Sequence, residues 1–105
     1  MKRYNKEKIK IIIEEADLPK NTKFLGYVIH LPKNDEYLFK TDNKALLIWS
    51  KTPQNAIKFK IYEKACDIVK KFSRGDLIIC IVLDIGKQLA TIPDHDAQEI
   101  IKIHQ

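Results

Sequence analysis

The chain has 105 residues, of which 45% are hydrophobic and 31% are charged. This length suits one domain with a single core, spanning 1–105, and this composition is too apolar for an intrinsically disordered protein. No stretch approaches the ~20 consecutive apolar residues of a membrane span, and no signal-peptide pattern follows the charged start. We therefore expect no membrane partner and a cytoplasmic location.

The positive charge is uneven along the chain and consists almost entirely of lysine. The net charge is +5, with 17 lysines and two arginines. Residues 1–60 hold 13 Lys/Arg and seven Asp/Glu, whereas residues 61–105 hold six and seven. A basic half can attract an acidic partner or a phosphate backbone. The scarcity of arginine, which reads phosphates bidentately, disfavours specific nucleic-acid recognition.

The first predicted element covers residues 5–17, and two alternatives stay open for it. Asn5 can cap a helix, and four apolar residues would share one face of that helix: Ile9, Ile12, Ile13 and Ala16. A strand is the alternative because the β-branched isoleucines also alternate. The run from Glu14 to Ala16 favours the helix.

Three short apolar segments follow, at residues 24–31, 37–39 and 45–49. Turn residues separate them at 32–35 and 41–44. Connections this short allow only antiparallel pairing, so we expect a three-stranded meander.

Thr52-Pro53 has the composition of a helix start, with a hydroxyl cap before a proline. One helix over 53–73 is the first alternative. The second is a single turn at 53–57, a break near Phe59-Lys60 and a separate helix after it. The expected apolar face contains Ala56, Phe59, Cys66, Val69 and Phe72. Gly75 fits the position just after the helix end.

The last third of the chain predicts a buried strand, an edge strand and a helix. Leu77–Leu83 is apolar without alternation, as in a strand covered on both faces. Residues 88–92 fit an edge strand, which can pair with a second copy, so a homodimer stays open. Asp94 is expected to cap a helix with apolar residues Ala97, Ile100, Ile101 and Ile103. The fold class is therefore α+β, an antiparallel sheet of about five strands packed by helices in the order α-β-β-β-α-β-β-α.

No catalytic or cofactor motif is present in the sequence. Asp94-His95-Asp96 has ligand-type residues, but carboxylates also favour a helix N-terminus, and we name no metal ligand, catalytic residue or cofactor. Cys66 and Cys80 form no CxxC pair and are expected to be reduced, buried thiols.

Two groups of cations are the candidate contacts for nucleic acid or an acidic partner: Lys2, Arg3, Lys6, Lys8 and Lys10 near the start, and Lys58, Lys60 and Lys64 further on. Four aromatic residues are expected on the sheet: Tyr27, Tyr37, Phe39 and Trp49. They fit either a core or a base-stacking platform, and the absence of an RNP1-like motif favours the core.

The middle of the chain resembles small uncharacterised proteins encoded by bacteriophages and other mobile elements. The residues that carry the resemblance are Gly26–Ile29, Tyr37-Leu38, Trp49, Thr52-Pro53, Ala56, Phe59, Ala65 and Val69. They cover about half of the chain in a strand–strand–strand–helix module. The resemblance implies a host-takeover or anti-defence protein that binds and occludes a partner, and it supplies no site residue.

The leading functional hypothesis is a non-enzymatic protein that binds another macromolecule, foremost a protein. The first alternative is a nucleic-acid-binding module that uses the N-terminal lysine cluster. The second is a small enzyme or accessory subunit with His95 and Asp96 at its site.

Overall fold

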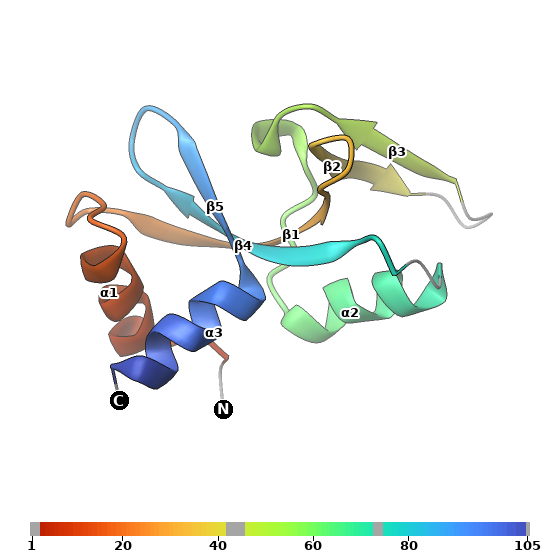
Figure 1. Ribbon diagram of the computed structural model, residues 1–105. Coiled ribbons are helices and arrows are strands. Elements are labelled where there is room, and N and C mark those ends of the chain that lie inside the picture. Colours follow the sequence, from red (N-terminus) through yellow and green to blue (C-terminus); the bar gives the residue numbers. More distant parts are fainter. Residues whose placement is uncertain (1–2, 42–45, 73–74, 105) are drawn as a thin grey trace.

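The computed structural model describes residues 3–41, 46–72 and 75–104 (Figure 1). The elements are α1 (Lys6–Glu15), β1 (Lys23–Leu31), β2 (Glu36–Thr41), β3 (Leu47–Ser50), the 3₁₀ turn η1 (Pro53–Asn55), α2 (Tyr62–Lys71), β4 (Ile78–Asp84), β5 (Leu89–Pro93) and α3 (Asp94–Ile103). The predicted α+β class and element order are confirmed, and η1 is an addition. Lys2, Ala45 and most of the predicted turn at 41–44 lie outside the described residues, while Thr41 ends β2.

The five strands form one antiparallel sheet in the order β3-β2-β1-β4-β5. The predicted meander β1-β2-β3 and the edge position of β5 are confirmed. β4 is buried on both faces, because the consecutive residues Cys80, Ile81, Val82 and Leu83 are all buried and successive side chains of a strand point to opposite faces.

The sheet separates two apolar clusters of unequal size. The three helices lie on one side of the sheet (Figure 1), where the larger cluster includes Ile12 of α1, Ala65 of α2 and Ile101 of α3. The smaller cluster is formed by Val28, Tyr37, Ala56, Cys80 and Val82. Val28 and Cys80 are partners across β1 and β4, and Ala56 follows η1, so the η1 segment helps to cover the second face of the sheet.

The segment 5–17 forms a helix and not a strand. Asn5 caps α1, with its side-chain oxygen accepting a hydrogen bond from the Lys8 backbone N–H at 2.9 Å. Ile12 and Ile13 are buried, as the helical spacing predicts. The prediction for Ala16 is wrong, because the helix ends at Glu15 and the exposed Ala16 is its C-terminal cap.

Residues 53–72 follow the second of the two alternatives. The Thr52 side chain makes no capping hydrogen bond, and η1 is a single turn. The chain then extends, and Phe59 exchanges both backbone hydrogen bonds with Tyr27 at 2.8 Å. This pairing is available because the β1–β2 register covers only His30–Tyr37 and Leu31–Glu36. A continuous helix would leave the buried backbone N–H of Tyr27 without this partner.

Gly26 permits this close approach of the Phe59 segment. Its φ is +130°, and a Cβ on Gly26 would lie 2.5 Å from the Phe59 carbonyl oxygen. A residue with a side chain would therefore meet both backbone strain and a steric clash.

Three details of the later helices differ from the predictions. In α2 the fully buried residue is Ala65, whereas Cys66 is half-buried, because the helix begins at Tyr62 and not at Pro53. Phe72 caps this helix, so Gly75 lies too far along to be the residue just after the cap. In α3, Ile103 is 72% exposed and does not belong to the core.

Asp94 is the first residue of α3 and not its cap. Pro93 occupies the cap position without a side-chain hydrogen bond. The Asp94 side chain is buried because residues from the start of the chain bind it.

Candidate functional site

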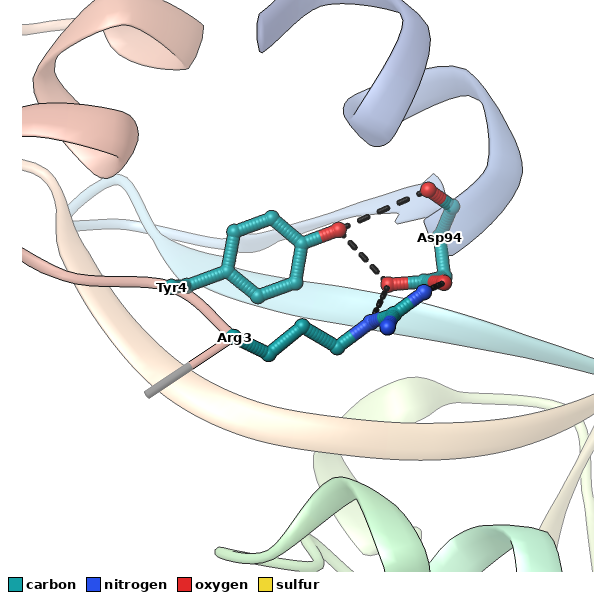
Figure 2. Close-up of polar contacts among 3 residues, drawn as sticks. All are labelled: Arg3, Tyr4 and Asp94. Atoms are coloured by element: carbon teal, nitrogen blue, oxygen red, sulfur yellow. Dashed lines mark hydrogen bonds and ion pairs between the residues drawn. The ribbon is translucent and has the colours of Figure 1, made fainter. Parts of the chain in front are cut away.

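The main buried polar cluster joins the segment before α1 to the start of α3. The Arg3 guanidinium forms two hydrogen bonds with the Asp94 carboxylate, from Nε to Oδ1 at 3.0 Å and from Nη2 to Oδ2 at 2.5 Å (Figure 2). The Tyr4 hydroxyl donates to Asp94 Oδ1 at 2.6 Å. The carboxylate thus accepts from three donors, which compensates for its burial.

Aromatic rings pack around this cluster and partly shield it from solvent. The Arg3 guanidinium carbon lies 3.8 Å from the centre of the Tyr62 ring, a cation–π geometry. The Tyr4 ring packs against Phe24 and Tyr27 at centroid distances of 5.7 and 6.0 Å. Burial, together with the hydrogen bond to Asp94, raises the pKa of Tyr4 above its ordinary value. The hydrogen bond to Asp94 likewise raises the pKa of Arg3, so this cluster holds an ion pair and a neutral phenol.

This cluster fastens the segment before α1 to the start of α3. Sequence reasoning missed it, because it placed Arg3 among surface cations and Asp94 at a helix cap. The two residues are 91 positions apart, and no local pattern signals such a pairing.

Two cavities share Tyr62 in their lining. One of about 280 Å³ is lined by residues of α2, β4 and the start of α3, including Val69, Asp94 and His95. The other, of about 270 Å³, is lined in part by Arg3, Tyr4 and Lys60. The carboxylate and guanidinium that reach these cavities are already bonded to each other, which disfavours them as reacting groups.

The histidines do not assemble a reactive centre. His95 and Asp96 are both exposed on α3. His30 Nε2 lies 3.0 Å from Asp35 Oδ1, and its ring stacks on Tyr37. His104 Nε2 lies 2.9 Å from Glu15 Oε2. Within the described ranges, no group of three His, Cys, Asp or Glu residues is placed to hold a metal ion.

The structure distributes the predicted contact cations over several environments. Arg3 points inward to Asp94, and Lys60 donates to the Leu25 carbonyl at 3.0 Å. Lys58 donates to the carbonyls of Pro53 and Gln54, both at 2.6 Å, and burial lowers its pKa. Lys64 is exposed on α2, and Lys8 is half-buried on α1.

Lys6 and Lys10 lie along an open groove beside α1. This groove of about 710 Å³ has an apolar floor that includes Ile9, Ile13 and Leu18. Its rim mixes Lys6, Lys10 and Lys20 with Glu14 and Asp17. The opposing charges favour a solvated rim over a track for phosphates.

The aromatic residues of the sheet belong mainly to the core. Tyr27 and Tyr37 are buried, and Trp49 is partly buried against the larger cluster. Phe39 differs, because 46% of its surface is exposed. A stacking platform of all four rings is therefore absent from this sheet.

The β2–β3 hairpin gathers three of the exposed large apolar residues of the described chain. Five large apolar residues of the described chain are exposed. Three of them belong to this hairpin: Phe39 (46%), Leu46 (54%) and Ile48 (39%). β3 is also an end strand of the sheet. Exposed apolar residues that gather in one place mark interaction sites more often than isolated ones do.

The register shows that Phe39 and Ile48 share one face. Leu38 and Trp49 are cross-strand partners that pack toward the larger cluster. Phe39 follows Leu38 and Ile48 precedes Trp49, so both point to the opposite face. Lys40 is the cross-strand partner of Ile48, after a register shift between Leu38 and Lys40. We call Phe39, Lys40 and Ile48 the hairpin face.

Comparisons with known proteins give no relative: no family model, no curated protein and no solved structure matches this chain. Among the helices that the structure describes, none is long and apolar enough to cross a membrane.

Proposed function

We propose that this chain is a non-enzymatic protein that binds another protein through the hairpin face. The observation that carries the proposal is the exposure of Phe39 and Ile48 on one side of an edge hairpin. Burying such side chains against a partner removes apolar surface from water, at about 25 cal/mol per Å². The main buried polar cluster supports the same proposal, since Asp94, Arg3 and Tyr4 bind one another and are not free to react with a substrate.

The hairpin face continues the smaller apolar cluster outward. Tyr37 and Phe39 are two positions apart along β2 and so share a face of the sheet, with Tyr37 buried and Phe39 exposed. A partner that covers Phe39 and Ile48 would extend a core that the chain already has. Two free cysteines support a cytoplasmic location for this interaction. The resemblance to mobile-element proteins adds the expectation that binding occludes the partner.

The test is affinity purification of the tagged protein from cells of its source, with and without nuclease. The binding variant is Phe39→Ser/Ile48→Ser. The matched control is Ile103→Ser, which removes a still more exposed apolar residue (72%) at the far end of α3. We expect a discrete protein to co-purify with the native chain and with the control after nuclease treatment. The recovered amount of this protein should fall at least tenfold with the binding variant.

Two results would overturn the proposal. Equal retention by the hairpin variant would show that the surface lies elsewhere. Recovery that disappears with nuclease would instead identify a nucleic-acid-binding protein.

A further inference from the structure

We infer that the segment of the partner protein that binds the hairpin face is acidic as well as apolar. This inference rests on the proposed function and adds the chemistry of the partner. It follows from the charges around Phe39 and Ile48, from the position of Lys40 between them, and from what the neighbouring cations already bind.

The described residues between Tyr37 and Lys60 carry positive charge only. They contain Lys40, Lys51, Lys58 and Lys60 and no Asp or Glu. The sequence here also holds Asp42 and Lys44, outside the described residues, so residues 37–60 carry five lysines against one acid. Among the described residues, the nearest acids along the chain are Asp35 and Glu36, at the opposite end of β2 from Lys40. Asp35 lies against His30, and Glu36 is half-buried. The hairpin face therefore complements a negative partner.

Lys40 is the cation best placed to select that partner. It is exposed and lies opposite Ile48 in the register, next to Phe39. The other lysines nearby have backbone acceptors: Lys51 donates to the Asn34 carbonyl at 3.0 Å, and Lys58 to two carbonyls. A partner segment matches this arrangement if it places a carboxylate beside Lys40 and packs apolar side chains against Phe39 and Ile48.

The same charges disfavour a second copy of this chain as the occupant. Two hairpin faces in contact would bring Lys40 and its symmetry mate into one apolar interface, where like charges are costly. The β5 edge, expected from the sequence to allow dimerisation, ends at Pro93, which lacks a backbone N–H for pairing. An acidic segment of a different protein has neither disadvantage.

The test uses three synthetic ten-residue peptides that alternate Val or Ile with Glu, Gln or Lys. Each is titrated into the full-length ¹⁵N-labelled chain and followed by NMR. We expect the Glu peptide to shift the amide signals of Phe39, Lys40 and Ile48, with an affinity at least tenfold above that of the Gln peptide. This affinity should fall several-fold between 50 and 300 mM salt.

Charge reversal isolates the role of Lys40. Lys40→Glu should abolish the preference for the Glu peptide and favour the Lys peptide, while Lys102→Glu, exposed on α3, should leave the preference unchanged. Folding of each variant is checked by its NMR spectrum away from the hairpin. Equal binding of the Glu and Gln peptides at the hairpin would overturn this inference and leave the proposed function intact.

Two further results would also overturn the inference. One is an absence of shifts at the hairpin face with every peptide. The other is a stronger response of the same amides to a twelve-residue oligothymidylate, which would assign the lysines to a phosphate backbone. The proposed function is judged separately, by the partner's sensitivity to Phe39→Ser/Ile48→Ser, so the two failures are distinguishable.

Discussion

At the scale of single residues, Gly26 shows how one position without a side chain sets the path of a distant segment. Its neighbour Tyr27 pairs with Phe59, and the Phe59 carbonyl occupies the space where a Cβ would lie. The glycines of the chain form a natural series for this effect. Gly86 has a positive φ of +109° with open space around it, and Gly75 has neither constraint.

We expect Gly26→Ala to lower the free energy of unfolding by about 3 kcal/mol, because strain and a clash with backbone act together. Gly86→Ala should cost about 1 kcal/mol through strain alone, and Gly75→Ala less than about 0.5 kcal/mol. Urea denaturation of the three variants gives the comparison. A Gly26→Ala loss no larger than that of Gly86→Ala would show that the Phe59 segment moves aside freely.

At the scale of elements, the Arg3–Asp94 pair joins α3 to the segment before α1. The pair is asymmetric in exposure, since 35% of the Arg3 side chain is exposed against 8% of the Asp94 side chain. Removing the arginine therefore leaves a buried carboxylate with Tyr4 as its remaining side-chain donor. Replacing both residues by apolar ones leaves no such charge.

We expect Arg3→Met to lower the free energy of unfolding by about 2–3 kcal/mol, because it leaves the buried Asp94 charge unpaired. Arg3→Met/Asp94→Leu should lose less than the sum of its single variants. The measurement is a double-mutant cycle by urea denaturation at pH 7. Strict additivity would mean that the pair does not couple α3 to the segment before α1.

The elements that could be predicted from sequence are those with local causes. Asn5 and the isoleucine spacing of α1 act within two helical turns, and the unbroken apolar run of β4 reports burial on both faces. Thr52-Pro53 also gives a strong local signal, yet the helix does not continue, because the Phe59 backbone completes a ladder with β1. Tertiary pairing overrides helix propensity there.

The candidate site was harder to predict than the fold. Phe39 was expected on the sheet, but a single sequence reveals neither the shift in pairing between Leu38 and Lys40 nor the 46% exposure of Phe39. The inward turn of Arg3 depends on a partner 91 positions away. Both features arise from register and long-range contact, not from composition.

At the scale of the whole molecule, titratable groups are buried on both faces of the sheet. Cys80 lies in the smaller cluster, and burial raises the pKa of its thiol to about 12. Tyr27 lies in the larger cluster, and burial raises the pKa of its phenol to about 12. The ordinary pKa values are 9.0 and 10.0, so the unfolded chain ionises first as the pH rises.

The stability that Cys80 and Tyr27 contribute by staying protonated should therefore be fully present below pH 9 and decline as the pH rises from 9 toward 12. Each group contributes about 1.4 kcal/mol per pH unit in its own window. Cys80→Ala should flatten the decline between pH 9 and 10, and Tyr27→Phe should reduce it above pH 10. Denaturant unfolding at several pH values measures both, and unchanged slopes in the two variants would contradict this account.

The parallel packing of the first and last helices has a consequence for circular permutation of the chain. α1 and α3 lie side by side (Figure 1), and Glu15 reaches His104 while Arg3 reaches Asp94. The chain ends therefore lie at opposite ends of this helix pair, and a linker that spans the length of one helix, ~15 Å, can join them. The β4–β5 turn at Gly86-Lys87 is exposed. With the chain opened at the β4–β5 turn, this gives a circular permutant in which every strand keeps its neighbours.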